Sequence, residues 1–286
     1  FLEHWNGSTY YISQTVDGIV DRQAVGSELR YFDPNSSFLS LVDYDISYGV
    51  LNIALLQGTV QLGGKTSLNL LVDHRLSPIM QTSNALINET NTSISSFLQL
   101  GMTEEQLRAQ AEDRTPTSDL IMLGVTHNFN PTWQVGGDIK VYDISGTPAS
   151  GAPPATPIMA TAGTGNVYVY TLQGIATGLM TQRDVTVLSL STISSDAYDG
   201  KSIALNNRTI LWENWTIDFS IRHYQQEDTA GTEQTRLTPI LRVGYRWRDR
   251  ITFEAEAGLE KSQTTSGSQT EDSDLNFYTI GYRWDF

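Results

Sequence analysis

Residues 277–286, FYTIGYRWDF, alternate strictly between two kinds of side chain. One parity carries Tyr278, Ile280, Tyr282, Trp284 and Phe286, and the other carries Phe277, Thr279, Gly281, Arg283 and Asp285. Alternation with a period of two predicts a β-strand that has one apolar and one polar face. Aromatic side chains of this kind gather at membrane interfaces, although a terminal strand of a soluble sheet would alternate in the same way. The rest of the chain has to distinguish the two.

The composition narrows the class of protein. The chain has 286 residues, of which 39% are hydrophobic, with no Cys and a formal net charge of −14. It has no run of about 18–20 apolar residues, so a membrane-spanning form would have to cross with strands. A chain without Cys suits the oxidising route through a bacterial periplasm, and the negative charge disfavours a nucleic-acid partner. Because the first residues, FLEHWNGSTYYISQT, already have the pattern of a strand, we expect the chain to be part of a longer protein.

Alternating segments recur along the whole chain, with turn signals between them. Fourteen strands are predicted, with sixteen as the alternative count. Each has about ten residues or more, which is the length of a tilted transmembrane strand and about twice that of a usual soluble strand. They cover residues 5–15, 23–32, 38–48, 51–62, 66–77, 119–129, 133–144, 167–179, 185–197, 201–211, 215–225, 235–247, 251–262 and 275–286.

The connections between these strands divide into two sets. Counted back from the C-terminus, every second connection is short, near Pro34, Gly64, Pro131, Arg183, Asn214 and Arg248. Most of the others are longer, including 15–22, 78–118, 145–166, 226–234 and 263–274. Outer-membrane barrels have short periplasmic turns and longer outer loops in alternation. The pattern therefore predicts an all-β, transmembrane, antiparallel up-and-down β-barrel as a single domain over 1–286, with periplasmic termini and extracellular loops.

Aromatic residues gather at the strand ends that carry the short turns. This placement predicts an aromatic girdle at the periplasmic rim of a barrel. A soluble sandwich has no need of such a girdle, and the chain has few helical segments that could cover a sheet. The predicted girdle consists of Trp133, Trp212, Trp215, Trp247, Trp284 and Phe286.

The polar face of the predicted strands would line the lumen. Its ten acids and eight bases nearly cancel, so the lumen is expected to have mixed charge. Cross-strand ion pairs are expected between the Glu254, Glu256 and Glu260 row and the arginines on the strands beside it. These pairs either stabilise the barrel wall or form a pore constriction. The predicted lumen-lining residues are Glu28, Arg30, Asp43, Asp45, Asp73, Arg75, Asp138, Lys140, Arg208, Asp218, Arg222, Arg242, Arg246, Glu254, Glu256, Glu260, Arg283 and Asp285.

The long connection at 78–118 has its own organisation. Thr103-Glu104-Glu105-Gln106 has the form of a capping box and predicts a short helix. A second helical turn is expected at SISSFLQL, with Gly101 as its C-cap. This insert either covers the mouth, enters the lumen as a plug, contacts a partner, or forms a solvated cap without a gating role. The other long loop, 146–166, is rich in Pro, Gly, Ala and Thr, which predicts an extended, mobile segment.

Several segments together resemble a known class of protein. They are SNALINE (83–89), TEEQLRAQAEDRT (103–115), SGTPASG (145–151), LRVGYRWR (241–248) and the terminal GYRWDF (281–286). The combination resembles the C-terminal region of large proteobacterial proteins with tetratricopeptide repeats, and a terminal Phe after alternating apolar residues resembles the closing strand of outer-membrane barrels. The resemblance implies a periplasmic helical array before an outer-membrane barrel, similar to exporters of poly-N-acetylglucosamine and cellulose. It also implies outer-membrane lipid, lipopolysaccharide, the barrel-assembly machinery acting on the C-terminal strand, and a periplasmic repeat domain or envelope complex as partners.

Motifs for catalysis are missing from the sequence. The four His residues, His4, His74, His127 and His223, do not recur with Ser or Asp in a nucleophile motif. The sequence has no metal-ligand spacing such as HExxH and no phosphate loop, so no cofactor is expected. Two functions remain open. The first is a channel that exports a polar polymer or passes small hydrophilic solutes; the second is a non-conducting anchor in an envelope or surface-appendage assembly.

Overall fold

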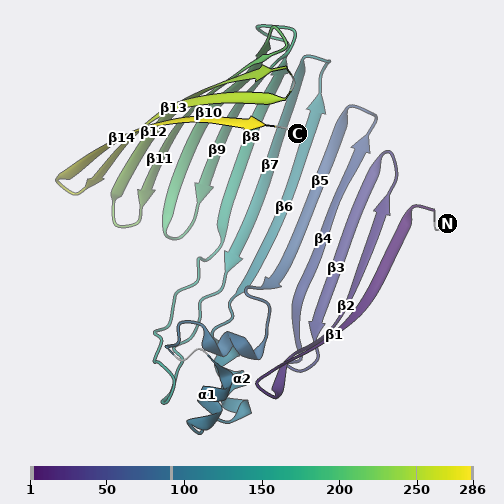
Figure 1. Cartoon of the computed structure of the whole chain (residues 1–286), viewed down its shortest axis with the longest axis vertical. Helices are drawn as coiled ribbons and strands as arrows, with labels where there is room; N and C mark the ends of the chain where they lie inside the picture. Colours follow the sequence, from purple (N-terminus) through teal and green to yellow (C-terminus); the bar gives the residue numbers. More distant parts are fainter. Residues whose placement is uncertain (1–2, 91–92, 249, 285–286) are drawn as a thin grey trace. The chain divides into compact units, whose positions relative to one another are not determined.

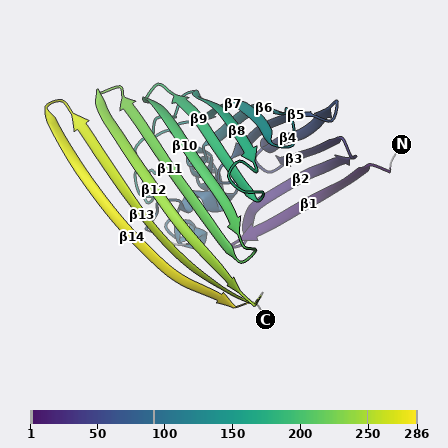
Figure 2. The ribbon, with the colours of Figure 1, turned by 90° about the horizontal axis from the view of Figure 1, so that it is seen from above.

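The computed structural model describes residues 3–90, 93–248 and 250–284. It contains fourteen strands, each hydrogen-bonded to its neighbour in the chain, in the unbroken order β1 to β14 (Figures 1 and 2). This is the strand order of an up-and-down barrel, and the predicted all-β, antiparallel fold class with about fourteen strands is confirmed. The strands are β1 (Trp5–Val16), β2 (Ile19–Phe32), β3 (Ser36–Asp45), β4 (Val50–Leu62), β5 (Thr66–Leu76), β6 (Thr117–Asn128), β7 (Trp133–Ile144), β8 (Val167–Thr177), β9 (Asp184–Ser194), β10 (Tyr198–Leu211), β11 (Trp215–Asp228), β12 (Thr232–Trp247), β13 (Ile251–Ser266) and β14 (Gln269–Trp284).

The last four strands are longer than the sequence pattern predicts. Strands β12, β13 and β14 have 16 residues each, and the predicted loops 226–234 and 263–274 are wrong. Most of both segments continues the strands, which turn tightly at Gly231 and Gly267, each with a positive φ. The predicted loop 15–22 is also wrong, because β1 and β2 meet in a two-residue turn at Asp17 and Gly18 with φ of 51° and 87°. An Asp-Gly pair suits such a hairpin turn because both of its central residues need φ above zero.

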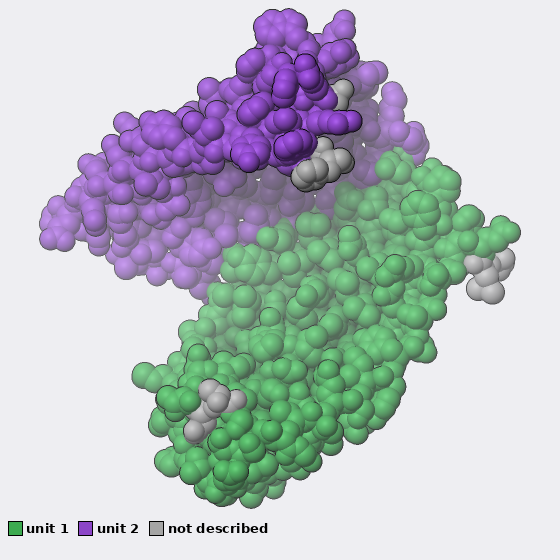
Figure 3. All heavy atoms as spheres, in the orientation of Figure 1, with its two compact units in different colours: residues 1–62, 68–123, 140–167 green, residues 63–67, 124–139, 168–286 purple. Residues whose placement is uncertain are grey.

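The chain divides into two compact units (Figure 3). Unit 1 comprises residues 1–62, 68–123 and 140–167, and therefore holds β1 to β4, most of β5, and the two long connections. Unit 2 comprises residues 63–67, 124–139 and 168–286, and holds β9 to β14 and nearly all of β8. Among the described residues, no helix is long and apolar enough to cross a membrane.

The insert between β5 and β6, residues 77–116, carries the helices labelled in Figure 1. It packs around a small core that also includes Ala155. It contains a 3-10 helix η1 (Thr82–Leu86) and the helices α1 (Ile94–Gln99) and α2 (Glu104–Asp113). The predicted capping box is confirmed, since the Gln106 amide donates to Thr103 Oγ1 at 3.2 Å and the Thr103 amide donates to Gln106 Oε1 at 2.9 Å. The C-cap of α1 is Leu100, and Gly101 follows it with a φ of 94°. The fully buried core side chains are Ala85, Ile94, Phe97, Leu107 and Ala111.

Candidate functional site: the polar face of the sheet and the docked insert

Two faces of opposite character run across unit 2. The apolar face carries directly opposite rows of large side chains, for example Phe219, Leu241, Ala257 and Tyr278 on β11 to β14. Many of these side chains are exposed, and Tyr278 and Ile280 on β14 reach 78% and 89%. Soluble monomers rarely expose contiguous apolar patches of more than a few hundred Å². This face therefore needs an apolar environment, and the face behind it, here called the polar face, carries the charges.

A row of alternating charges crosses the polar face. Arg208, Asp218, Arg242 and Glu256 lie directly opposite one another on β10 to β13. The Arg208 Nε atom lies 3.6 Å from Asp218 Oδ1, and Arg242 Nε donates to Glu256 Oε2 at 2.7 Å. We call these four residues the charge ladder. Its side chains are partly solvated, so each pair contributes at most about 1 kcal/mol to stability, and the ladder mainly places alternating charge on an open surface.

The predicted ion pairs around the Glu254 to Glu260 row are partly confirmed. Glu256 pairs with Arg242, as predicted, but Glu260 pairs with Arg236, whose Nε lies 3.6 Å from Glu260 Oε1. Arg236 lies in the predicted strand 235–247 and on its polar parity, but it was not among the predicted lumen-lining residues. Glu254 lies opposite Gly244 and Gly281 in the register. Arg246 and Arg283 flank Thr252 instead of a glutamate.

The polar face of unit 2 is hollowed beside the ladder. The larger hollow, of about 760 Å³, is lined by Arg222, Tyr224, Arg236 and Glu260 and by many hydroxyl groups. The hydroxyl residues are Thr171, Ser189, Ser191, Ser202, Ser220 and Thr238. Hydroxyls both donate and accept hydrogen bonds, so this surface offers a wetted wall of balanced charge to a polar solute.

Around Asp43 the polar face of unit 1 is filled instead of open. Asp43 was predicted to line a lumen; it lies on the polar parity but is only 1% exposed. Its carboxylate accepts hydrogen bonds from Arg22 Nη2 at 2.7 and 2.8 Å, Tyr10 Oη at 2.8 Å and Asn52 Nδ2 at 3.0 Å. We call Tyr10, Arg22, Asp43 and Asn52 the Asp43 network. The network joins β1 to β4 across the face.

Asp45 also differs from its predicted role as a solvated lumen residue. It is fully buried and accepts hydrogen bonds from Ser47 Oγ at 2.6 Å and the Tyr48 amide at 2.9 Å, so it caps the turn between β3 and β4. The insert covers this region, because the Met80 amide donates to Asn52 Oδ1 at 3.0 Å. Asp43 and Asp45 therefore lie on the predicted face of the sheet, but neither side chain is accessible to solvent.

The insert is held on the ends of β1 to β4 by polar contacts. Thr82 Oγ1 donates to the Val20 carbonyl at 2.9 Å, and the Ser83 amide and hydroxyl donate to Asp21 Oδ1 at 2.8 and 2.6 Å. The Ser95 amide donates to Asp17 Oδ2 at 2.8 Å. Of the alternatives weighed for the insert, these contacts within unit 1 favour a segment folded over the polar face at the strand ends.

The Tyr48 ring is a second contact between the insert and the strand ends. Its hydroxyl lies 2.8 Å from Thr82 Oγ1, and the Arg108 guanidinium lies over the ring at 5.1 Å from its centre. Burial raises the pKa of Tyr48 to about 12. The phenol therefore stays protonated and able to donate throughout the physiological range.

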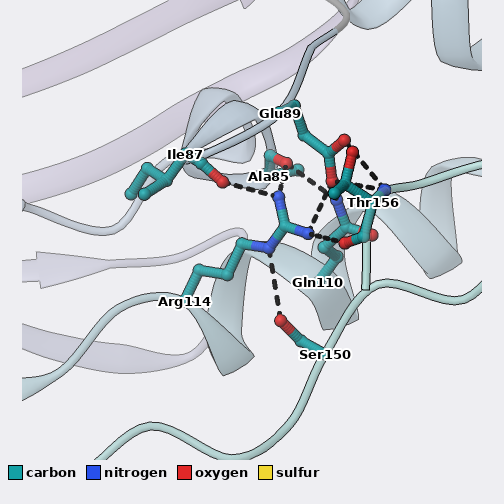
Figure 4. A network of polar contacts seen from close by, with 7 residues as sticks. All are labelled: Ala85, Ile87, Glu89, Gln110, Arg114, Ser150 and Thr156. Carbon is teal, nitrogen blue, oxygen red and sulfur yellow. Dashed lines mark hydrogen bonds and ion pairs between the residues drawn. The ribbon is translucent and has the colours of Figure 1, made fainter. Parts of the chain in front are cut away.

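A buried ion pair joins the insert to the second long loop (Figure 4). Arg114 Nη2 lies 2.6 Å from Glu89 Oε1, and the two side chains are 3% and 0% exposed. The Thr156 amide of the loop donates to Glu89 Oε2 at 2.9 Å. The other partners of Arg114 are the carbonyls of Ala85, Ile87 and Thr156 and the hydroxyl of Ser150.

The loop at 146–166, which its composition predicts to be extended and mobile, is paired with itself and with the insert. Thr147 pairs with Thr161 and Ser150 with Ile158 in antiparallel bridges, and Ala155 is buried in the core of the insert. Gly and Ala in this loop have little or no side chain and Pro has a fixed φ, so the loop can approach the insert closely. The signal that sequence reasoning missed is the buried pair of Glu89 and Arg114, which attaches the loop.

The ion pair makes the insert sensitive to acid. Burial alone would raise the pKa of Glu89, but hydrogen bonds from Thr156 and Arg114 outweigh it and hold the pKa below the ordinary value. A lowered folded-state pKa gives stability that is present above the ordinary value of 4.5 and is lost as the pH falls through the lower, folded value. We expect the insert to become cleavable by pepsin in that acid range. In the variant Glu89→Gln, cleavage of the insert should not depend on the titration of this side chain. If cleavage had the same pH profile in both proteins, Glu89 would not be the group that makes the insert sensitive to acid.

The remaining predicted residues lie as their parity requires. Arg30 pairs with Glu28, and Arg75 Nε donates to Asp73 Oδ1 at 3.1 Å, both along single strands. Lys140 Nζ lies 5.1 Å from the centre of the Tyr142 ring, and Asp138 lies two residues before it on β7. Asp285 and Phe286 lie outside the described residues. The predicted girdle residues Trp133, Trp212, Trp215, Trp247 and Trp284 are all exposed and lie at strand ends or in a turn.

Titratable groups elsewhere have structural partners. His74 Nδ1 lies 2.7 Å from Asp119 Oδ1, and His127 Nδ1 lies 2.8 Å from Thr66 Oγ1. Glu271, Asp272 and Asp274 belong to β14. Over the described ranges, no group of three His, Asp or Glu side chains could hold a metal ion.

Comparisons with known proteins give distant likenesses only. No known protein family matches the chain, and no curated protein does. Among solved structures, the chain is similar to a loop L8 deletion mutant of OmpT, an outer-membrane protein of Vibrio cholerae, with 12% identity, a TM-score of 0.46, and coverage of 98% of this chain and 97% of that one. It is similar to a bacterial polysaccharide outer-membrane secretin with 12% identity, a TM-score of 0.48, and coverage of 99% and 86%. A third is an anion-selective porin from Comamonas acidovorans, with 8% identity, a TM-score of 0.36, and coverage of 99% and 100%.

Proposed function

We propose that this chain is a bacterial outer-membrane channel for polar solutes. The observation that carries the proposal is the division of unit 2 into an exposed apolar face and a hollowed polar face with the charge ladder. In a bilayer the apolar face contacts lipid and the polar face lines a water-filled lumen. Unpaired backbone groups cost several kcal/mol each in hydrocarbon, so the sheet has to close with its terminal strands paired.

The spacing of residues on the apolar face supports this location. On β11 the apolar-face series runs from Trp215 at one end to His223 and Gln225 at the other. At about 3.4 Å per residue and a tilt of about 40°, that stretch covers about 25 Å along the membrane normal. This equals the usual height of the apolar band of an outer-membrane barrel. Trp215, whose ring centre lies 4.7 Å from that of Tyr245, then lies at one interface.

The balanced polar face favours hydroxyl-rich or neutral polar cargo over a strongly charged one. The charges of the ladder alternate, and six of the fourteen residues that line the hollow beside it are Ser or Thr. A polar polymer such as an exopolysaccharide and small hydrophilic solutes both fit this chemistry. We propose polymer export as the finer function because of the resemblance to repeat-containing exporters described above, with a periplasmic repeat domain as the partner.

Current through the purified chain in a planar bilayer tests the proposal. We expect steady conductance, and we expect Arg242→Glu to shift selectivity towards cations. The substitution changes the side-chain charge by two units. At a distance of about 10 Å in water, this alters the energy of a small ion by about 0.8 kcal/mol, which changes the local concentration of that ion about fourfold. Arg250→Glu makes the same charge change in a turn outside the ladder and should shift selectivity less. Equal shifts for both variants would show that the ladder does not line the conducting path.

A non-conducting anchor is the second candidate, and the filled polar face of unit 1 is the observation that favours it. The Asp43 network and the insert occupy that face with bonded groups instead of water. Replacing residues 79–115 by a short Gly-Ser linker separates the two functions. A channel should conduct more after this deletion, because the insert lies over the polar face. Silence before and after the deletion would establish the anchor.

A further inference from the structure

The apolar face of unit 2 has a cationic edge at the end of the strands away from Trp215. Thr192, Lys201 and Gln225 lie directly opposite one another on β9, β10 and β11, and Leu190, Ile203 and His223 form the next row. All six side chains lie on the apolar face. A lysine on this parity is unusual in a chain of net charge −14, since the polar face is where the strands place most of their charge.

This edge borders a groove in the apolar face. The groove has a volume of about 430 Å³, and Lys201 and His223 lie on its wall together with Tyr170, Leu172, Leu190 and Ile203. Lys201 and His223 are diagonal neighbours on adjacent strands, which places their Cβ atoms at most about 8 Å apart. A single phosphate group can contact the Lys201 ammonium and an N–H of the His223 imidazole at that spacing. An apolar floor below these two donors matches a lipid whose acyl chain lies along the strands and whose phosphate lies at the edge.

A second lysine extends the same edge. Lys261 lies on β13, on the apolar parity, two strands from His223 through Leu237 and opposite Asp274. Lys201 and Lys261 are separated by three strand spacings, or about 14 Å. That span suits a disaccharide that carries a phosphate at each end, with Gln225, on the strand next to Lys201 within the span, able to bond its hydroxyls.

Acidic residues limit the level at which a phosphate can bind. Asp199, Glu227 and Glu233 lie directly opposite one another, two residues beyond Lys201 and Gln225 on the same face. Two residues correspond to about 7 Å along a strand. The acids therefore repel a phosphate placed further out and favour one that binds beside Lys201 and His223, at the boundary of the apolar band.

We propose that this groove, with Lys201 and His223 at its edge, binds the phosphorylated disaccharide lipid of the outer leaflet, the lipid A part of lipopolysaccharide. The proposal rests on the membrane location in the proposed function and on the insert end of the strands facing outwards, but not on conduction. An ordinary phospholipid has one phosphate and no disaccharide, so it would use Lys201 and His223 without reaching Lys261.

Native mass spectrometry of the full chain in detergent tests this assignment. Bisphosphorylated lipid A, the same lipid without phosphates, and phosphatidylglycerol are titrated in parallel. We expect lipid A to bind most tightly, and the double variant Lys201→Gln with His223→Gln to bind it about tenfold more weakly, which corresponds to about 1.4 kcal/mol. The matched control is Lys65→Gln, at an exposed lysine in the turn between β4 and β5, which should bind as the unmodified protein does.

Three results would overturn the proposal. They are unchanged lipid A binding by the double variant, equal loss in Lys65→Gln, and phosphatidylglycerol binding as tightly as lipid A. If the double variant does not fold, amine labelling of the unmodified protein gives the answer, because lipid A should protect Lys201 and leave Lys65 reactive. If the protein carries no current but binds lipid in a phosphate-dependent way, the channel proposal is wrong and this site is supported.

Discussion

Asp43→Ala is expected to destabilise unit 1 by about 3–5 kcal/mol, the usual cost of removing one partner of a buried ion pair. The Arg22 guanidinium is buried, its two hydrogen bonds to a carboxylate both go to Asp43, and its Nε has no partner in the described part of the chain. Alanine would leave that charge uncompensated beside Tyr10 and Asn52, which lose their acceptor as well. Samples heated to increasing temperatures and then run on a gel without boiling give the temperature at which the folded band disappears. This temperature should fall in parallel with the loss of stability.

The same substitution at Asp73 is the matched control. Asp73 also lies on the polar parity and pairs with an arginine, but the Arg75 side chain is 45% exposed and stays hydrated when its partner is removed. Solvated pairs contribute about 1 kcal/mol or less. If Asp43→Ala and Asp73→Ala lowered the transition temperature equally, the Asp43 network would not be the stabilising element that its burial indicates.

Arg114→Met is expected to release the insert from the second long loop. Methionine preserves much of the side-chain volume but leaves the Glu89 carboxylate buried without its cation, at a cost of about 3–5 kcal/mol. It also removes the donors to the carbonyls of Ala85 and Ile87. Hydrogen exchange of the amides in α2 should rise sharply, because local opening of the insert then needs far less free energy.

An exposed arginine supplies the control for this second prediction. Arg183 pairs with Glu213 at 3.5 Å, and both side chains are more than half exposed. Arg183→Met should change stability by about 0.5 kcal/mol or less. In addition, Glu89→Leu combined with Arg114→Met removes both charges and should recover part of the lost stability. Protection of α2 in the single variant equal to that in the unmodified protein would disprove the structural role of the pair.

The alternation of FYTIGYRWDF and its counterparts was sufficient to predict the number, order and faces of the strands. The alternation is informative because each strand has one face that must be apolar where it crosses the apolar band. It failed at 263–274, where Gln263, Asp272 and their neighbours pair beyond that band. There both faces of the strands are in water, so the side chains do not alternate and a strand has the composition of a loop.

The accessibility of the predicted site residues could not be obtained from parity. Asp43, Asp218 and Glu256 all lie on the polar face, yet only Asp43 is covered. The difference comes from Tyr10, Arg22 and Asn52, which surround the Asp43 carboxylate. The insert contacts this group through the Met80 amide and Asn52, and that contact depends on the insert's own fold. Arg22 was missed for a related reason, because its segment was assigned to a loop; the Asp17-Gly18 pair was the available signal for a tight hairpin there.

The long reach of the docking contacts sets an order of assembly. Apart from β5 with β6 and β7 with β8, which pair across the two long connections, the strand pairings close short turns, so those hairpins can form early. Docking of the insert joins residues far apart, 62 positions for Thr82 with Val20 and 78 for Ser95 with Asp17. Because β1 to β4 must already present their ends, the insert is the last part of unit 1 to settle. The insert can also detach from the strand ends while every hairpin stays paired.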